Sequence, residues 1–163
     1  MNVIKELVIN KDIESVWNVM GTQFADVHLW SSNFQDSKPG GTQKFEGLAY
    51  SSRVTLTGRG ETIQELDSFD ATNHRFSYHI SKGIPSIVKT AVGIWALEPI
   101  GDIQSKLVLE FQMEPNGLLG TLLTPVIKKK FGKVASDIAE ELKYYVENGT
   151  PHPRKVAANS TTG

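Results

Sequence analysis

The stretch TPVIKKKFGKVASDIAEELKYYV, residues 124–146, decides the fold. Its apolar residues recur at steps of three and four, which predicts one stripe along an α-helix: Ile127, Phe131, Val134, Ile138, Leu142 and Tyr145. Thr124 is a suitable N-cap with Pro125 at the first helical position, and Asn148-Gly149 suits a helix end. At about 1.5 Å per residue such a helix is roughly 35 Å long. A rod of that length with one apolar stripe needs one broad apolar surface to lie on.

The composition limits the class of protein. A chain of 163 residues is expected to form one domain and to bury roughly 70% of its unfolded surface. The absence of cysteine excludes disulfides and thiolate metal sites, and a net charge of −1 with interspersed acids and bases argues against a nucleic-acid partner. No apolar run is long enough to span a bilayer, and the N-terminus does not read as a secretory signal. We therefore expect a cytoplasmic protein without stable membrane insertion.

The first third of the chain predicts one strand and two short helices. Residues 2–9 alternate as a strand does, and Lys5 on the apolar face indicates either an edge position or a twisted end. Asp12 is a suitable N-cap for a short helix that Gly21 ends, with an apolar face made of Ile13, Val16, Trp17 and Met20. A second short helix is expected over about residues 23–30. Residues 31–48 are polar and glycine-rich, with at most one short strand near residues 33–37.

Five strands separated by turn residues follow. They are expected at residues 50–57, 61–69, 75–81, 87–97 and 103–113, and each connection is short and rich in Gly, Asn, Asp or Pro. This spacing is typical of hairpins and predicts an antiparallel meander. Alternation gives the sheet one apolar face, which includes Phe76, Tyr78, Ile80, Leu107, Leu109, Phe111 and Met113. The sequence therefore predicts an α+β fold in which a curved antiparallel sheet wraps around the long C-terminal helix.

This order of elements resembles the helix-grip fold, and the sequence resembles the START-like (SRPBCC) superfamily, specifically its polyketide cyclase/dehydrase and lipid-transport group. The match extends over about residues 2–147 and rests on short groups: Ile13-Glu14-Ser15-Val16-Trp17, Trp30, Arg53, Gly58-Arg59-Gly60, Gln64-Glu65-Leu66-Asp67, Asp70, Phe76-Ser77-Tyr78, Gly93-Ile94-Trp95, Glu114-Pro115-Asn116-Gly117 and residues 142–149. The resemblance implies a helix-grip domain over residues 1–149 with a cavity for an apolar small molecule between helix and sheet. Residues 150–163, rich in Pro, Ser, Thr and Ala, are expected to be a disordered tail.

With that cavity in mind, nine residues are candidates for ligand binding: Trp30, Arg53, Gln64, Phe76, Tyr78, Thr90, Phe111, Leu123 and Ile127. The aromatic residues among them could equally be plain core. For Arg53 a surface position or a structural ion pair is favoured, because a charge inside an apolar cavity needs a partner. In the abscisic acid receptors of plants, which are larger-pocketed relatives, the position matching Gln64 is a ligand-facing acid. The amide here does not carry that chemistry over. For His28 a structural role is favoured over ligand contact.

No catalytic motif is present. The sequence has no Gly-x-Ser-x-Gly elbow and no His-Glu-x-x-His, and its four histidines lack the spacing of metal ligands. We therefore expect neither metal nor cofactor, and the favoured function is binding, transport or sensing of a lipid- or polyketide-like molecule by a monomer or homodimer. The alternative is a polyketide aromatase/cyclase or dehydratase, for which only Arg53, His28 and Tyr78 are available. A regulatory or chaperone role with an empty interior is a third possibility.

Two further segments each allow two interpretations. Residues 117–123, Gly-Leu-Leu-Gly-Thr-Leu-Leu, predict either a helical turn that plugs the end of the sheet or a flexible apolar rim over a cavity mouth. The run Lys128-Lys129-Lys130 is either a solvated helix face, with pairing of the Lys133–Asp137 kind, or a contact for anionic lipid. In both cases the first interpretation is favoured.

Overall fold

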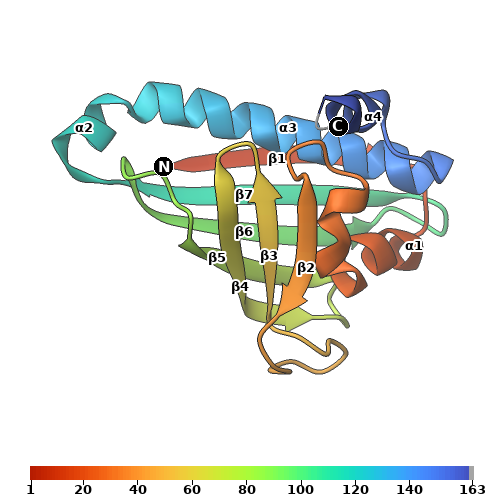
Figure 1. Ribbon diagram of the computed structural model, residues 1–163. Helices are drawn as coiled ribbons and strands as arrows, with labels where there is room; N and C mark the ends of the chain where they lie inside the picture. Colours follow the sequence, from red (N-terminus) through yellow and green to blue (C-terminus); the bar gives the residue numbers. More distant parts are fainter. Residues whose placement is uncertain (162–163) are drawn as a thin grey trace.

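One curved antiparallel sheet and one long helix make up most of the molecule. The computed structural model describes residues 1–161, and Figure 1 shows its elements. The strands are β1 (Asn2–Ile9), β2 (Asp36–Gly40), β3 (Ser52–Thr57), β4 (Gly60–Asp70), β5 (Arg75–Lys82), β6 (Val88–Pro99) and β7 (Ser105–Pro115). The helices are α1 (Ile13–Trp17), η1 (Asn18–Thr22), η2 (Phe24–Leu29), α2 (Gly117–Leu122), α3 (Thr124–Asn148) and α4 (Pro153–Ser160).

The sheet is a meander to which the N-terminal strand is added as an edge strand. Its order is β1-β7-β6-β5-β4-β3-β2, and every neighbouring pair is antiparallel. The edge position expected for residues 2–9 is confirmed. The five predicted strands are all present with ends shifted by one or two residues, whereas β2 begins later than expected because Ser31 and Phe34 are held in turns.

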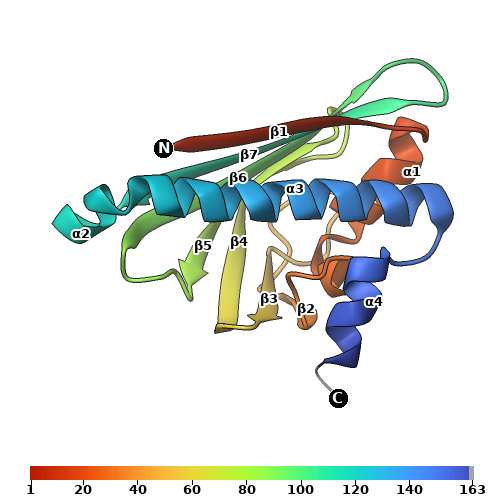
Figure 2. The same ribbon diagram turned by 90° about the horizontal axis from the view of Figure 1, so that it is seen from above.

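Helix α3 lies across the concave face of the sheet, as Figure 2 shows from above. Ile127, Ile138 and Leu142 of the predicted stripe are buried, and the other three stripe residues are partly buried against the core. The predicted helix end is confirmed, because Gly149 takes the left-handed conformation (φ 72°). The molecule therefore has the helix-grip fold that the periodicity and the resemblance implied.

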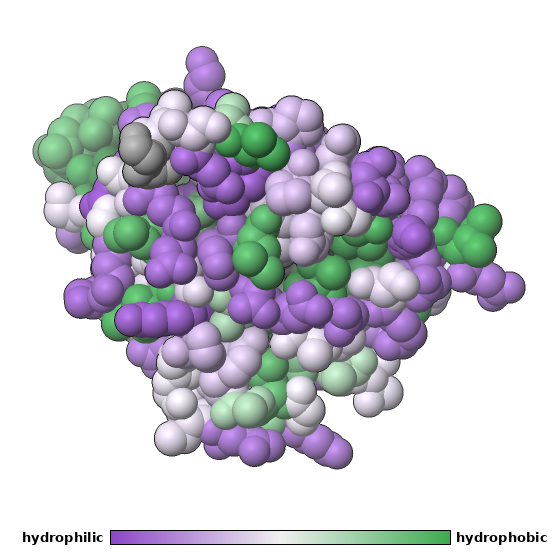
Figure 3. All heavy atoms as spheres, turned by 45° about the vertical axis from the view of Figure 1, so that its right-hand side comes forward, coloured by the Kyte–Doolittle hydropathy of each residue, from purple (hydrophilic) through white to green (hydrophobic). Residues whose placement is uncertain are grey.

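The expected N-cap of this helix is wrong. Thr124 is already helical, and its hydroxyl donates to the carbonyl oxygen of Gly120 over 3.3 Å instead of accepting from the first turn. This happens because residues 117–122 form α2, which leads almost directly into α3. The plug expected from this segment is also wrong: Leu118, Leu119 and Leu122 are 60–79% exposed. They contribute to the apolar group at the left edge of the surface in Figure 3.

The short N-terminal helices fill the other end of the sheet. The predicted cap of α1 is confirmed, since Asp12 Oδ1 accepts from the backbone N–H of Ser15 over 2.9 Å. Gly21 does not end the helix as expected, because the chain continues through the π-helical turn η1. A Cβ at Gly21 would lie 2.6 Å from the Trp17 ring, so glycine permits this close approach.

The expected disordered tail is in fact helical over Pro153–Ser160. Pro153 occupies an early helical position, and the ring of His152 accepts from the backbone N–H of Arg154 over 3.0 Å. Lys155 is buried, and its ammonium group donates to the carbonyl oxygen of Phe34 over 2.8 Å. These contacts fix a segment whose composition alone suggests disorder. Within residues 1–161, none of the helices is long and apolar enough to cross a membrane.

Candidate functional site

A cavity of about 490 Å³ lies between α3 and the concave face of the sheet. Such a volume falls in the range of small-molecule sites. Its wall is largely apolar and includes Ile80, Ala91, Phe111, Phe131, Val134 and Ile138. Gln64 and Tyr78 reach it from the strands, and Asn33 and Phe34 reach it from the loop after η2.

The cavity exists because the helix touches only part of the sheet. Helix α3 packs directly on β1 and β7, at one edge. Strands β4 to β6 curl away from it, and their inward side chains face α3 across the gap. Small residues keep this part of the wall open: Ala91 and Gly93 are inward-facing residues of β6 that line the cavity. The sheet curvature therefore leaves a partly open cavity between the helix and the sheet.

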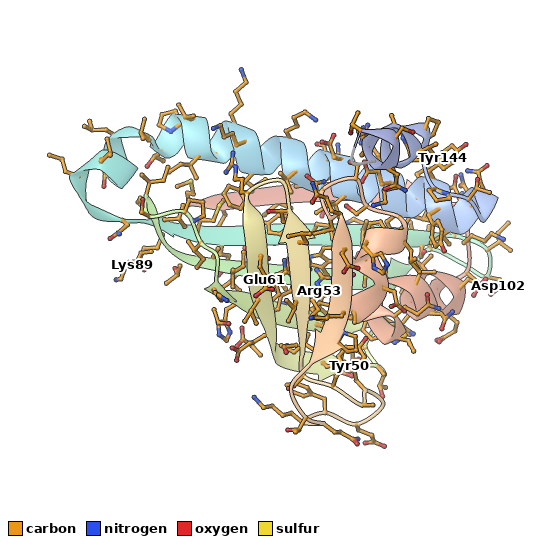
Figure 4. All side chains as sticks on the ribbon, in the orientation of Figure 1. Tyr50, Arg53, Glu61, Lys89, Asp102 and Tyr144 are labelled. Carbon is orange, nitrogen blue, oxygen red and sulfur yellow. The ribbon has the colours of Figure 1, made fainter. Side chains whose placement is uncertain are left out.

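Arg53 is the most unusual side chain beside the cavity. It lies on β3 and is 1% exposed (Figure 4). Its Nε donates to Gln64 Oε1 and its Nη1 to the carbonyl oxygen of Phe24, both over 2.7 Å. The guanidinium carbon stands 4.0 Å from the centre of the Phe24 ring. Burial lowers the pKa of Arg53 to about 10, so the group stays charged at neutral pH.

This environment corrects the favoured interpretation of Arg53. The side chain is not on the surface, and among residues 1–161 no carboxylate pairs with it. It does not line the cavity itself but lies directly behind Gln64 and Tyr78, which do. Its Nη2 and the Nε1 of Trp95 are buried without a hydrogen-bond partner. The arginine is therefore a buried cation held by neutral acceptors and aromatic rings.

Arg53 determines what its neighbours present to the cavity. A guanidinium can only donate, so Gln64 must turn its oxygen to Arg53, which leaves its NH₂ group for the cavity side. The Tyr78 ring centre is 5.4 Å from the guanidinium carbon. Burial raises the pKa of Tyr78, so its hydroxyl keeps its proton at neutral pH. Both groups can therefore donate hydrogen bonds to a bound molecule.

The structure brings only part of the predicted set to the cavity wall. Of the nine candidates, Gln64, Tyr78 and Phe111 line it. Trp30 and Phe76 belong to the solid core, where the Phe76 ring packs 5.3 Å from that of Phe24. Thr90 is exposed because the register of β6 shifts between Val88 and Thr90. Leu123 and Ile127 belong to the first part of the helical segment and do not line the cavity.

Three other polar side chains, His28, Glu110 and Lys133, form hydrogen bonds or ion pairs within the protein. The Nδ1 of His28 lies 2.7 Å from the hydroxyl of Ser37, which agrees with the favoured interpretation. Glu110 accepts from the side chain of Asn2 on the outer face of the sheet. Lys133 pairs with Asp137 as expected for a solvated helix face. Within residues 1–161, no group of three or more histidine or acidic residues is placed to hold a metal ion.

Several wall residues were not predicted as site residues. Phe131, Val134 and Ile138 belong to the predicted helix stripe, and their position on it is the signal that points to them. Ala91 and Gly93 could have been found as small residues at inward positions of a strand. Nothing in the sequence pattern points to Asn33 and Phe34, because the loop that carries them has no periodicity.

Comparison with known proteins places this architecture in a family. A comparison with curated protein sequences finds no match. A START superfamily protein from Mycobacterium smegmatis has the same fold, with a TM-score of 0.75 at 15% identity over 91% of this chain and 99% of that one. A norcoclaurine synthase point mutant from Thalictrum flavum, in complex with a transition-state analogue, gives 0.70 at 12% identity over 91% and 95%.

A two-domain aromatase/cyclase, BexL, of the BE-7585A biosynthetic pathway gives a TM-score of 0.69 at 12% identity. This chain is covered over 89% of its length and BexL over 47%. At such identities these likenesses show the fold alone. The family model for polyketide cyclase/dehydrase and lipid transport matches residues 2–147, nearly the whole helix-grip architecture. The chain therefore belongs to the polyketide cyclase/dehydrase and lipid transport family.

Proposed function

We propose that the protein binds a small apolar molecule, lipid- or polyketide-like, in the cavity between the sheet and α3. The observation that carries this proposal is the cavity itself, about 490 Å³ with a mainly apolar wall. Burial of apolar surface contributes about 25 cal/mol per Å², so a ligand that fills this space gains most of its affinity from the wall. The few polar groups, Gln64 and Tyr78 among them, would orient it.

The composition of the wall supports binding over catalysis. The described residues that line the cavity include no histidine and no acidic residue. Apart from the exposed Lys130 and Lys133, a general acid or base would therefore have to be Tyr78, whose raised pKa makes it a poor base at neutral pH. The solved structures of similar fold include an aromatase/cyclase and a norcoclaurine synthase. The alternative function, a cyclase or dehydratase, is therefore tested separately. If the protein is such an enzyme, the Tyr78→Phe variant should lose turnover of a poly-β-keto substrate.

The test of binding compares two substitutions on one strand. Ala91→Phe fills the cavity from its wall, whereas Ala96→Phe adds the same ring to a half-buried position of β6 that does not line the cavity. Native mass spectrometry with a panel of fatty acids and aromatic polyketides should show bound adducts for the wild type and Ala96→Phe. Ala91→Phe should bind at least about tenfold more weakly, since its ring occupies the ligand's place. Equal adducts in all three proteins, or none in the wild type, would refute the proposal.

A further inference from the structure

The buried polar groups around Arg53 have a surplus of hydrogen-bond donors. Among residues 1–161, three buried side-chain nitrogen or oxygen atoms lack a hydrogen-bond partner: Asn33 Nδ2, Arg53 Nη2 and Trp95 Nε1. All three are N–H donors, and no buried side-chain acceptor in the described part of the chain is left over. Asn33 lines the cavity, and Arg53 and Trp95 lie directly behind Tyr78, with the Trp95 ring 6.0 Å from the guanidinium carbon.

The groups that face the cavity beside Arg53 are also donors. Gln64 offers its NH₂ group because its oxygen is taken by Arg53. Arg53 and Trp95, which lie beside the Tyr78 ring, carry only N–H donors, so neither can accept the Tyr78 proton, and that proton is left for the cavity. A ligand group placed here therefore meets two hydrogen-bond donors with a buried positive charge behind them.

The charged side chains of the wall have a single sign. They are Arg59, Lys130 and Lys133, all exposed at the open side, and no acidic residue lines the cavity among the described residues. Lys133 pairs with Asp137. For Arg59 and Lys130, no carboxylate of residues 1–161 lies within ion-pair distance. Arg53, Arg59 and Lys130 therefore give the surroundings of the cavity an excess of positive charge, which water screens least at the buried Arg53 end.

We infer that the apolar ligand carries an anionic oxygen head, a carboxylate or an equally acidic enol, seated against Gln64 and Tyr78 with Arg53 behind them. The inference rests on the proposed function and narrows it to one chemical class. Charge-assisted hydrogen bonds are stronger than neutral ones, and a buried head group avoids the solvent screening that weakens the lysines at the opening. The apolar part of the ligand would extend along Phe111, Phe131 and Val134.

The test uses four probes of matched apolar length at neutral pH: dodecanoate, dodecanol, dodecylamine and an alkyl-substituted cyclic β-diketone. Their dissociation constants are measured by isothermal titration calorimetry with the full-length protein. Dodecanoate or the β-diketone should bind at least about tenfold more tightly than dodecanol, and dodecylamine most weakly. The better of the two anionic probes distinguishes a carboxylate from an enolate.

Two variants locate the head group. Tyr78→Phe keeps the ring and removes one donor, so it should reduce the preference for the anion over dodecanol to about threefold or less while dodecanol affinity changes little. It avoids Arg53, whose removal endangers folding. Lys129→Met removes an exposed charge that does not line the cavity, and should leave the preference unchanged.

The outcomes separate this inference from the proposed function. If dodecanol or dodecylamine binds as tightly as the anionic probes, the cavity binds apolar molecules but the anionic head is wrong. If Lys129→Met abolishes the preference and Tyr78→Phe does not, surface charge rather than the Arg53 end produces it, and the inference is again wrong. If none of the four probes binds, both the inference and the proposed function are contradicted.

Discussion

At the scale of single residues, the first question is how the protein compensates the burial of the charged Arg53 guanidinium. Desolvating a charge is expensive, and among residues 1–161 no carboxylate lies close enough to Arg53 to offset that cost. Two features replace the ion pair. The fork of the guanidinium joins β3, β4 and η2 through Gln64 and the Phe24 carbonyl, and the Phe24 ring covers it at 4.0 Å. Arg53 therefore connects three elements around the polar end of the cavity.

The pair Arg53–Gln64 can be tested with a double-mutant cycle. Arg53→Met should lower the free energy of unfolding by about 2–4 kcal/mol, because it leaves the Gln64 oxygen and the Phe24 carbonyl without a donor. Gln64→Leu should also destabilise, because it leaves the buried cation with one acceptor fewer. The loss of unfolding free energy in the double variant should be about 1–2 kcal/mol smaller than the sum of the losses in the two single variants. Urea denaturation of all four proteins measures these losses. Strict additivity would mean that the two side chains are not coupled.

Two glycines allow a matched comparison of close packing. A Cβ at Gly93 would stand 2.5 Å from the Tyr78 ring, whereas a Cβ at Gly132 on α3 would meet nothing within 4 Å. Gly93→Ala should therefore destabilise by about 1–3 kcal/mol and displace Tyr78 from the cavity wall. Gly132→Ala should stabilise by up to about 1 kcal/mol through helix propensity. Thermal unfolding of both variants checks the opposite signs, and an equal effect would contradict the packing described.

At the scale of elements, α4 holds together parts that are distant in the sequence. Glu141 of α3 is fully buried, and it accepts from the backbone N–H of Ser32 over 2.8 Å and from Arg154 of α4 over 3.1 Å. Lys155 donates to the carbonyl oxygen of Phe34, and Phe34 lines the cavity. The helix therefore holds the loop over residues 31–34 against α3, and with it one side of the proposed site.

Removal of α4 tests this connection. A chain ending at Gly149 should lose about 2–4 kcal/mol of unfolding free energy, because Glu141 loses its cationic partner and the Phe34 carbonyl its donor. It should also bind apolar probes more weakly, since Asn33 and Phe34 are no longer held. The control ends at Ser160 and keeps both contacts, so its urea midpoint should match that of the full chain. Equal stability of the two truncated chains would show that α4 holds nothing in place.

The cap of α1 has a predictable dependence on pH. Hydrogen bonds from the side chain and backbone of Ser15 lower the pKa of Asp12 below 3.8. A carboxyl group with a lowered pKa in the folded state stabilises above its unfolded pKa, and this contribution is lost as the pH falls through the folded pKa. Asp12→Ala should therefore be less stable than the wild type at neutral pH, with the difference shrinking below pH 3.8.

Urea denaturation at neutral and acidic pH measures that difference, with Asp12→Asn as the control. Asparagine retains a cap acceptor but does not titrate, so its stability relative to Asp12→Ala should stay nearly constant with pH. A difference between the wild type and Asp12→Ala that persists undiminished in acid would show that the charge of the carboxylate has no part in the cap.

How far the sequence predicts this fold depends on whether an element is periodic. Helix α3 and the five strands of the meander have clear apolar periods, and these predictions are confirmed. Helix α4 has no such pattern, because contacts through Arg154, Lys155 and the His152 cap hold it rather than an apolar stripe. The buried position of Arg53 differs from the predicted one for a related reason. On β3 the polar residues Arg53 and Thr55 face inward and Leu56 is 41% exposed, which reverses the usual alternation.

At the scale of the whole molecule, the proposed site is a consequence of where the helix rests. Helix α3 packs on β1 and β7, and the rest of the sheet curves around a space that neither surface fills alone. The apolar periodicity of the sequence therefore predicts the stripe of α3 and the apolar face of the sheet. The volume of the cavity between them depends instead on the curvature of the sheet and on small wall residues such as Ala91. A ligand that occupies this space would bind only the folded state, because the unfolded chain has no cavity.

Ligand binding should therefore raise the stability of the whole domain by mass action. At a free concentration of about one hundred times Kd, the gain is about 2.7 kcal/mol, which for a domain of this size raises Tm by roughly 5–10 °C. Differential scanning fluorimetry with the tightest probe measures it. Ala91→Phe should show no such shift, since its ring occupies the cavity, while Ala96→Phe should shift as the wild type does. A shift of equal size in Ala91→Phe would mean that the probe acts elsewhere on the surface, and the space under α3 would then be only a packing feature of the fold.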